Sequence, residues 1–237
     1  MFATSDVAQS LVYLDDTYLT ELTSVVVDAG NADAGIVLRE CLFHPQGGGQ
    51  PADRGWVDDI EVRPVRDEAG VIRLDPAAPT ADASRQVQLW SEGDAARVRV
   101  DRALRLRHAA LHTAGHLIEA AGVRLGWQLA GNNHFPGQAR IEFTPGSAPL
   151  PTHPADRDRD AARIREFVQQ SIAAGTPVRA STDQTGHRMV AIGRLHNAPC
   201  GGTHVRDLSC LVGVRLEVKV RKGRIRVAYD AEHGPGE

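Results

Sequence analysis

The sequence predicts an α+β protein of two domains, a small glycine-rich β-barrel-like domain over residues 1–96 and a helix-covered antiparallel sheet over residues 97–237. Three observations support this prediction. At roughly 150 residues per domain, a chain of 237 residues has room for one large or two small domains. Residues 1–96 contain short apolar runs separated by turn-forming residues, which is typical of small barrels and sandwiches. The rest of the chain alternates helical and strand-like patterns, which is typical of α+β domains.

The amino-terminal domain is predicted to consist of short strands. Each apolar run is bounded by glycine, proline, aspartate or asparagine, as expected of strands joined by tight turns. The expected strands cover residues 11–14, 23–27, 36–43, 56–62, 71–74 and 87–90. Residues 75–84 (DPAAPTADAS) are expected to form a loop. The pattern changes over residues 93–96, and we place the domain boundary there.

The carboxy-terminal domain is predicted to contain two helices and a hairpin. The expected elements are a helix over 101–125, a strand over 140–143, a helix over 160–174 and a hairpin over 212–229. The first helix contains no proline, and the second ends at a Gly-Thr-Pro sequence. In the hairpin, apolar and charged residues alternate on both sides of Lys222–Gly223, which predicts two strands with one buried face.

The composition excludes several classes of protein. With 42% hydrophobic and 24% charged residues, the chain is neither disordered nor collagen-like. No apolar run approaches about 18 residues, and the first ten residues lack the basic and apolar regions of a secretory signal. We therefore expect a cytoplasmic protein without a membrane span. Its three cysteines, an odd number, favour reduced thiols over a disulfide framework.

Two basic clusters are candidates for phosphate binding. The net charge of −3 does not by itself favour a nucleic-acid partner, so local clusters must supply the positive charge. The first comprises Arg97, Arg99, Arg102, Arg105 and Arg107, and the second comprises Arg215, Lys219, Arg221, Lys222, Arg224 and Arg226. From the sequence alone, each cluster is equally compatible with an ordinary solvated face.

Two short motifs contain candidate metal ligands. His112 and His116 lie four residues apart on the expected helix, so both imidazoles can reach one ion. The sequence PCGGTH places Cys200 and His204 beside two glycines that permit a tight turn. Together these side chains suit Zn²⁺. A cysteine protease with Cys200 as nucleophile is an alternative, but it leaves the histidine pair unexplained. The HExxH metalloprotease motif is excluded because no glutamate follows the first histidine.

A third motif is the sequence FHPQGGGQPADRG at residues 43–55. Gly47, Gly48 and Gly49 permit a ligand to approach the backbone closely, and Gln50 adds a donor and an acceptor. The motif lacks the Lys-Ser/Thr pair of a phosphate-binding P-loop. On its own it could equally be a turn between strands.

Three motifs follow one another along the chain, in the order FxPxGGGQPxDxG, HTxxHL and PCGGTHV. Together they make the chain resemble the editing domain of alanyl-tRNA synthetase and its free-standing relatives, the AlaX proteins. A more distant likeness is to the editing domain of threonyl-tRNA synthetase. The resemblance covers about residues 11–230 and is closest to the medium-sized AlaX class. It implies the editing-domain fold and a trans-editing deacylase, which hydrolyses the ester of a mischarged small amino acid on tRNA charged by another protein.

The resemblance also implies a set of site residues. It implies Zn²⁺ held by His112, His116, Cys200 and His204, with Gln50, Thr203 and His204 as catalytic residues. The groups expected to contact substrate are His44, Gly47, Gly48, Gly49, Gln50, Asn132, Asn133 and His134. Those expected to contact tRNA phosphates are Arg102, Arg105, Arg221, Lys222 and Arg224. Whether zinc activates water or positions the substrate is left open.

Several positions depart from the usual family pattern. His44 stands where members usually have tyrosine, and Cys41 where they have threonine. Residues 132–135 (NNHF) offer no counterpart of the threonine by which many members recognise serine. The default substrate implied by the resemblance is Ser or Gly on alanine tRNA. The alternative is a specialised deacylase for a Thr-like or non-standard amino acid such as fluorothreonine.

Two further classes of function compete with this interpretation. A zinc-stabilised tRNA-binding module without turnover would use all four ligands structurally and would unfold when the metal is chelated. A zinc hydrolase of small free esters or amides would act without tRNA. Both hypotheses keep the metal ligands and differ in what the remaining residues do.

Overall fold

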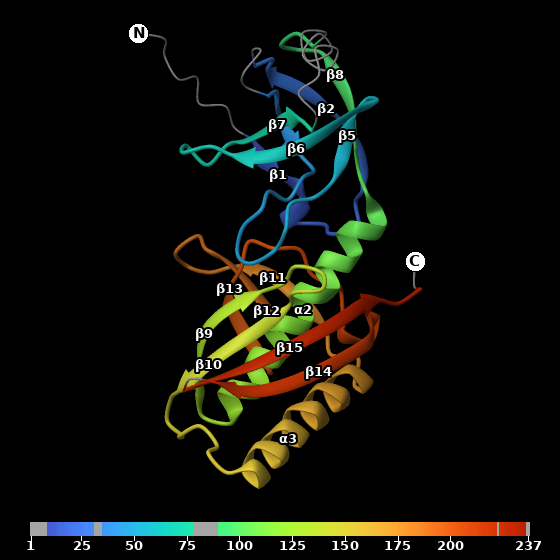
Figure 1. Cartoon of the computed structure of the whole chain (residues 1–237). Helices are drawn as coiled ribbons and strands as arrows, with labels where there is room; N and C mark the ends of the chain where they lie inside the picture. Colours follow the sequence, from blue (N-terminus) through green and yellow to red (C-terminus); the bar gives the residue numbers. More distant parts are fainter. Residues whose placement is uncertain (1–8, 31–34, 78–89, 222, 236–237) are drawn as a thin grey trace. The chain divides into compact units, whose positions relative to one another are not determined.

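The computed structural model describes residues 9–30, 35–77, 90–221 and 223–235 (Figure 1). It confirms a mixed α+β chain with antiparallel sheets. The chain divides into two compact units, residues 1–47 with 51–105, and Gly48–Gln50 with 106–237. The division falls inside a helix, whereas the predicted boundary at residue 96 lies inside a strand of the first unit. None of the helices in the described ranges is long and apolar enough to cross a membrane.

The first unit is built on a six-stranded sheet with strand order β3-β2-β8-β5-β6-β7. Its strands are β2 (Glu21–Asp28), β3 (Val37–Leu38), β5 (Gly55–Val57), β6 (Ile60–Arg66), β7 (Ile72–Pro76) and β8 (Ala95–Val100). In β8, Ala96, Val98 and Val100 are buried and the residues between them are exposed, as expected of a strand with one face in the core. An isolated bridge joins Ile36 to Leu74. Closure of this sheet into a barrel stays a prediction.

The expected strand at 11–14 is wrong beyond its first residue. A two-residue strand, β1 (Ser10–Leu11), pairs in parallel with β4 (Glu40–Cys41), and Val12–Leu14 forms the 3-10 helix η1. The tight turn buries the Tyr13 ring in the core, so an apolar run that resembles a strand here serves a helical turn. Of the expected strand at 87–90, residues 87–89 lie outside the described residues, as do residues 78–84 of the expected loop.

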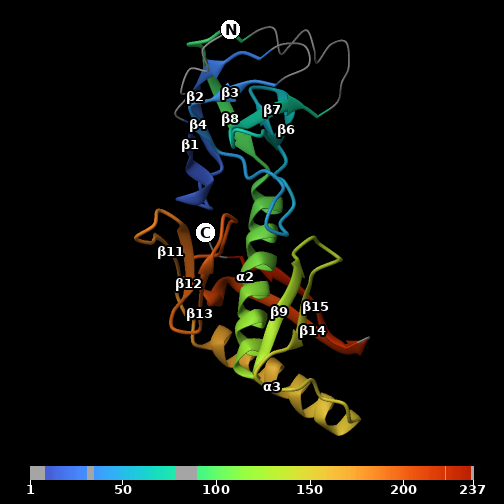
Figure 2. The ribbon, with the colours of Figure 1, turned by 90° about the vertical axis from the view of Figure 1, so that its left-hand side faces the viewer.

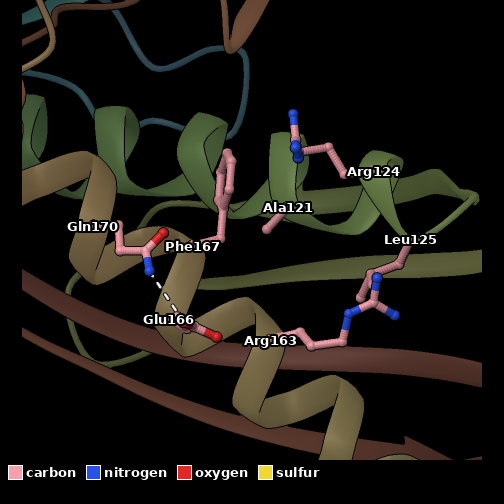
Figure 3. Close-up of a pocket in the computed structure, with 7 residues that line it drawn as sticks. All are labelled: Ala121, Arg124, Leu125, Arg163, Glu166, Phe167 and Gln170. Carbon is pink, nitrogen blue, oxygen red and sulfur yellow. Dashed lines mark hydrogen bonds between the residues drawn. The ribbon is translucent and has the colours of Figure 1, made fainter.

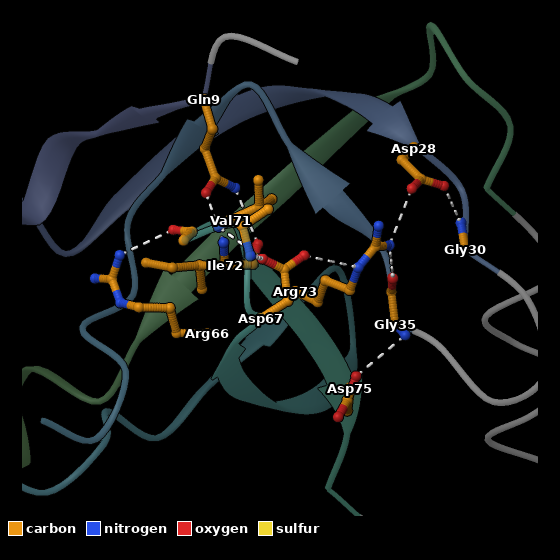
Figure 4. Close-up of polar contacts among 12 residues, drawn as sticks. Gln9, Asp28, Gly30, Gly35, Arg66, Asp67, Val71, Ile72, Arg73 and Asp75 are labelled. Carbon is orange, nitrogen blue, oxygen red and sulfur yellow. Dashed lines mark hydrogen bonds and ion pairs between the residues drawn. The ribbon is translucent and has the colours of Figure 1, made fainter. Parts of the chain in front are cut away.

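Side chains complete the hydrogen bonding of this sheet (Figure 4). The Gln9 amide accepts from the Ile72 backbone N–H at 2.8 Å and donates to the carbonyls of Ile72 and Leu38 at 3.0 and 3.1 Å. Arg73 pairs with Asp28 at 2.9 Å and lies 3.6 Å from Asp67. Gln9 therefore substitutes for a neighbouring strand and joins β3 to β7 through its side chain.

A buried ion pair fixes the segment around the glycine motif within the first unit. Arg105 and Asp53 are 0% and 4% exposed, and the Arg105 Nε donates to Asp53 at 2.9 Å. Asp53 also accepts from the His44 backbone N–H at 2.6 Å. The remaining guanidinium N–H groups donate to the carbonyls of Leu42 and Thr17. Because each charge is partnered, the pair can be buried.

The second unit contains two sheets and the two long helices. The larger sheet has strand order β14-β15-β10-β9 and is antiparallel throughout. The elements are α2 (Arg102–Arg124), β9 (Trp127–Asn133), β10 (Arg140–Pro145), α3 (Pro154–Ala173), β11 (Val178–Thr182), β12 (Arg188–Ile192), β13 (His196–Pro199), the 3-10 helix η2 (Leu208–Cys210), β14 (Leu211–Arg221) and β15 (Arg224–His233). Figure 2 shows α2 running between the two sheets.

The predictions for this unit hold for its longest elements. The helix expected over 101–125, the strand at 140–143 and the hairpin at 212–229 correspond to α2, β10 and β14–β15. The second helix begins earlier than predicted, at Pro154, because a proline is well placed in the first turn of a helix. Strand β9 was not predicted, because its sequence WQLAGNN lacks β-branched residues. It is held by pairing with β10.

Candidate metal centre

Helix α2 presents two of the expected ligands on one face. His112 and His116 are one turn apart, and their rings stack with centroids 5.1 Å apart and an interplanar angle of 9°. Both are buried, at 2% and 8% exposure. The i, i+4 spacing thus aligns the two imidazoles as the sequence pattern predicts.

The loop after β13 supplies the other two ligands. The Sγ of Cys200 lies 3.4 Å from Nε2 of His112 and 3.2 Å from Nε2 of His204. Gly202 makes this approach possible, because a Cβ at that position would overlap the His112 ring. Arg188 donates to the carbonyls of Cys200 and Gly202 at 2.6 and 3.2 Å and so fixes the course of the loop.

The four side chains fit a zinc ion. One ligand atom from each of His112, His116, Cys200 and His204 lies within 4.8 Å of the others. Ligand atoms on a tetrahedral zinc with Zn–S of about 2.3 Å and Zn–N of about 2.0–2.1 Å stand about 3.3–3.6 Å apart. The S···N distances of 3.4 and 3.2 Å come within a few tenths of an ångström of that spacing. Three imidazoles and one thiol are a donor set that zinc prefers.

Each histidine of the set is oriented through its Nδ1 atom. Nδ1 of His112 donates to the Gln50 Oε1 at 2.7 Å, and that of His204 lies 3.1 Å from Thr113 Oγ1. Nδ1 of His116 lies 2.9 Å from His196 and 3.5 Å from Glu119. Such contacts fix the tautomer and leave Nε2 for the metal.

Gln50 is hydrogen-bonded to His112, one of the four candidate ligands. Its side chain is fully buried, and its Oε1 also accepts from the Thr203 backbone N–H at 3.0 Å. Its Nε2 donates to the Thr203 hydroxyl at 3.0 Å. Both ends of the amide are thus engaged by the protein. Gln50 thus links Nδ1 of His112 to Thr203, which is also fully buried.

The polar residues at the end of β9 lie beside the metal set. The His134 ring stacks on His112 with centroids 4.3 Å apart, and its backbone N–H donates to the Gly49 carbonyl at 2.8 Å. Asn132 is exposed and lines Gly49, whereas the Asn133 side chain accepts from the Phe135 backbone N–H. His134 therefore belongs to the site's immediate surroundings.

The chain is similar in sequence to several known proteins. The chain is 27% identical to the alanyl-tRNA editing protein AlaX-M of Pyrococcus horikoshii over 83% of this chain and 85% of that protein. It is 30% identical to the alanyl-tRNA editing protein Aarsd1 of Rattus norvegicus over 85% of this chain and 53% of that protein. The chain is thus similar over most of its length to alanyl-tRNA editing proteins of the AlaX type.

A longer relative also matches. The chain is 32% identical to an alanine–tRNA ligase of Methanopyrus kandleri over 71% of this chain and 18% of that protein. It therefore spans about half of the rat protein and less than a fifth of the ligase. No family model matches the chain.

Two of the expected substrate-contacting residues belong to the first unit. His44 is 3% exposed and packs edge-on against Tyr13, with ring centroids 5.4 Å apart. Gly47 is exposed, and a Cβ there would meet nothing within 4 Å. Gly48 and Gly49 belong to the second unit and have positive φ values of 57° and 79°, which favour glycine.

The expected tRNA-contacting residues have different fates in the structure. The prediction that Arg105 contacts a tRNA phosphate is wrong, because its guanidinium is buried and bonded to Asp53. Arg102 is exposed, and Arg224 is exposed and lies 3.5 Å from Glu142. Arg221 is described only by its backbone, which pairs with Arg224 in the hairpin. Lys222 lies outside the described residues.

The sequence interpretation missed the residues that hold the ligands. Glu119 lies one turn after His116 on α2, a spacing that could have identified it. His196 and Thr113 had no such signal, because only the packing of β13 and of the Cys200 loop brings them to the histidines. All three cysteines, Cys41, Cys200 and Cys210, are free thiols in the structure.

Burial and neighbours shift the pKa values at the site. Burial opposes ionisation of the Cys200 thiol, but His116 and the Gly202 N–H bring its pKa below the ordinary value. Burial, followed by the nearby His116, lowers the pKa of His134 to about 3. Cys200 is thus suited to bind as thiolate, and His134 is a neutral imidazole at physiological pH.

A separate groove lies between α2 and α3 (Figure 3). It has a volume of about 310 Å³ and is lined by Ala121, Arg124, Leu125, Arg163, Glu166, Phe167 and Gln170. The Arg124 guanidinium stands 5.2 Å from the centre of the Phe167 ring. None of these residues is a ligand or an outer partner of the metal set, so the groove is distinct from the candidate site.

Proposed function

We propose that this chain is a trans-editing aminoacyl-tRNA deacylase that depends on bound Zn²⁺. The observation that carries the proposal is the convergence of His112, His116, Cys200 and His204 within 4.8 Å. The alanyl-tRNA editing proteins to which the chain is similar support the substrate, which is the ester of a small wrong amino acid, serine or glycine, on alanine tRNA. Bound zinc would supply Lewis-acid chemistry at that ester.

The chain's own residues prepare the site for this reaction. The Nδ1 contacts hold the three imidazoles in fixed tautomers, so no reorganisation is needed when substrate binds. His204 has the longest of the three Nδ1 contacts, 3.1 Å against 2.7 and 2.9 Å, and its partner is a hydroxyl. This difference supports His204 as the ligand that is most easily displaced from zinc. Because four protein ligands fill a tetrahedral site, catalysis requires that one of them can be displaced.

Phosphate contacts are assigned to the basic residues expected from the sequence, with one exception. We propose Arg102, Arg221, Lys222 and Arg224 for this role and leave Arg105 out because it is buried. Of these, Arg102 and Arg224 are exposed, and exposed guanidinium groups can neutralise phosphates.

The test compares two cysteine variants. Alanine tRNA charged with serine, glycine or alanine, and tRNA charged with threonine, are offered to the full chain with its zinc content measured. Cys200→Ala is expected to lose zinc and hydrolysis together. Cys210→Ala is the matched control, since Cys210 is half-buried and outside the metal set, and it should keep both.

Three outcomes would contradict the proposal. Full hydrolysis by zinc-free Cys200→Ala protein excludes zinc dependence. Selective release of threonine or a threonine analogue would replace the serine and glycine assignment by a specialised deacylase. Zinc binding with no release from any charged tRNA would favour a binding module without turnover.

A further inference from the structure

One buried polar atom beside the metal set has no partner. His134 is 1% exposed, and its Nε2 has no hydrogen-bond partner among the described residues. His134 is not a member of the four-ligand group, so the proposed metal does not account for this atom. An unpartnered polar atom in a buried position costs stability, so the presence of this atom needs an explanation.

The other nitrogen of His134 determines the tautomer. Tyr229 has a single hydroxyl proton, which it donates to the Leu111 carbonyl at 3.0 Å. The Tyr229 oxygen then accepts from Nδ1–H of His134 at 2.6 Å. A neutral imidazole has one N–H, so Nε2 carries a lone pair and can only accept.

The surrounding residues place that lone pair beside the site. The Cδ2 edge of the His134 ring faces Gly49 of the glycine motif, and the Cε1 edge faces Gly115 of α2. Nε2 lies between these two edges, and the ring face lies on His112. A Cβ at Gly115 would come within 2.6 Å of both Nδ1 of His134 and the Tyr229 oxygen. Glycine at 115 therefore keeps room for the His134–Tyr229 pair.

We propose that Nε2 of His134 accepts the side-chain hydroxyl of the amino acid carried by the tRNA. This inference rests on the proposed function and names the feature of the substrate that the site reads. An ester carbonyl has no proton to give, and a protonated amino group would stand close to the divalent ion of the proposed metal set. A hydroxyl donates without adding charge.

The consequence is a preference for serine over glycine or alanine. A site with a buried acceptor discriminates against a side chain that leaves the acceptor unpaired.

The test uses His134→Asn and His134→Gln in the full chain. An Asn amide can keep the donor to Tyr229 but has no atom at the Nε2 position, whereas a Gln amide can place its oxygen there. His134→Asn is expected to lower the ratio of kcat/KM for seryl over glycyl alanine tRNA about tenfold, the usual effect of one hydrogen bond. His134→Gln should restore part of that ratio. His187→Asn, at a histidine with a 73% exposed side chain, is the matched control.

A second measurement does not depend on turnover. Adenosine carrying an amide-linked seryl, alanyl or glycyl group at its 3′ position is titrated into zinc-loaded protein, and zinc content is measured for every variant. The wild type should bind the seryl compound about tenfold more tightly than the alanyl one, and His134→Asn should lose the difference.

Each outcome decides the proposal. An unchanged seryl-to-glycyl ratio in His134→Asn, or an equal loss on both substrates, overturns it. If His134→Asn does not retain zinc, the wild-type affinities decide, and equal binding of seryl and alanyl compounds overturns it. Failure of the wild type to hydrolyse any charged tRNA contradicts the proposed function instead, while the amide compounds still test His134.

Discussion

Gly202, which has no side chain, leaves the space that the His112 ring occupies. The Cβ of any other residue at position 202 would overlap the His112 ring and come within 2.8 Å of Gln50 Oε1. Position 201, next to it, would meet nothing within 4 Å. Of the two glycines of the CGGTH sequence, Gly202 is therefore the one whose lack of a side chain the packing requires.

This difference gives the first prediction. Gly202→Ala should displace His112 or the Cys200 loop and reduce bound zinc well below one ion per chain, while Gly201→Ala should retain it. Zinc is measured by atomic emission on protein purified in parallel, with circular dichroism as a check on folding. Equal zinc content in the two variants would show that the loop can move without losing the metal.

At the scale of elements, the segment that carries the glycine motif depends on its aspartate. Asp53 accepts from the His44 backbone N–H and from Arg105, both within the first unit. Asp53, the aspartate of the PxDxG part of the motif, thus holds this segment in place. Sequence resemblance marks such residues together with site residues and does not separate the two roles.

Loss of Asp53 should cost stability rather than chemistry. Asp53→Ala leaves Arg105 buried without its counter-charge, which costs about 3–5 kcal/mol. Asp59→Ala, at a side chain 98% exposed, should change the free energy of unfolding by less than about 0.5 kcal/mol. Urea denaturation of both variants measures this. A small effect of Asp53→Ala would mean that water replaces the carboxylate.

At the scale of the whole molecule, residues far apart in sequence meet at His112. Gln50 and Thr203 are 153 positions apart and share two hydrogen bonds. Gln50→Ala should leave Nδ1 of His112 without its acceptor and weaken zinc affinity about 10–100-fold, the range for lost outer partners. Gln46→Ala, at an exposed residue, is the control. Competition with a chromogenic chelator gives the affinity, and identical values would exclude the positioning role.

The charge distribution of the whole chain gives a prediction about salt. With a net charge of −3, tRNA binding must depend on local basic residues. The logarithm of the tRNA affinity should fall linearly with the logarithm of salt concentration, and Arg224→Ala should reduce the slope by about 1. Arg165→Ala, at an exposed residue of α3 outside the clusters, should not change it. Affinity independent of salt would exclude phosphate contacts.

The sequence by itself determined the elements with strong local periodicity and the four candidate ligands. Helix α2 and the β14–β15 hairpin follow from spacing that repeats over many residues. His112 with His116, and Cys200 with His204, are each close in sequence, so local backbone geometry alone brings each pair together. These features need no information about the rest of the chain.

Only the tertiary structure decided which residues act through others. The burial of Arg105, the engagement of both ends of the Gln50 amide and the unpartnered Nε2 of His134 all depend on groups from distant segments. Whether a polar side chain is free to meet a ligand is a question of which donors and acceptors surround it. Those neighbours are set by packing between elements, and sequence spacing carries no record of them.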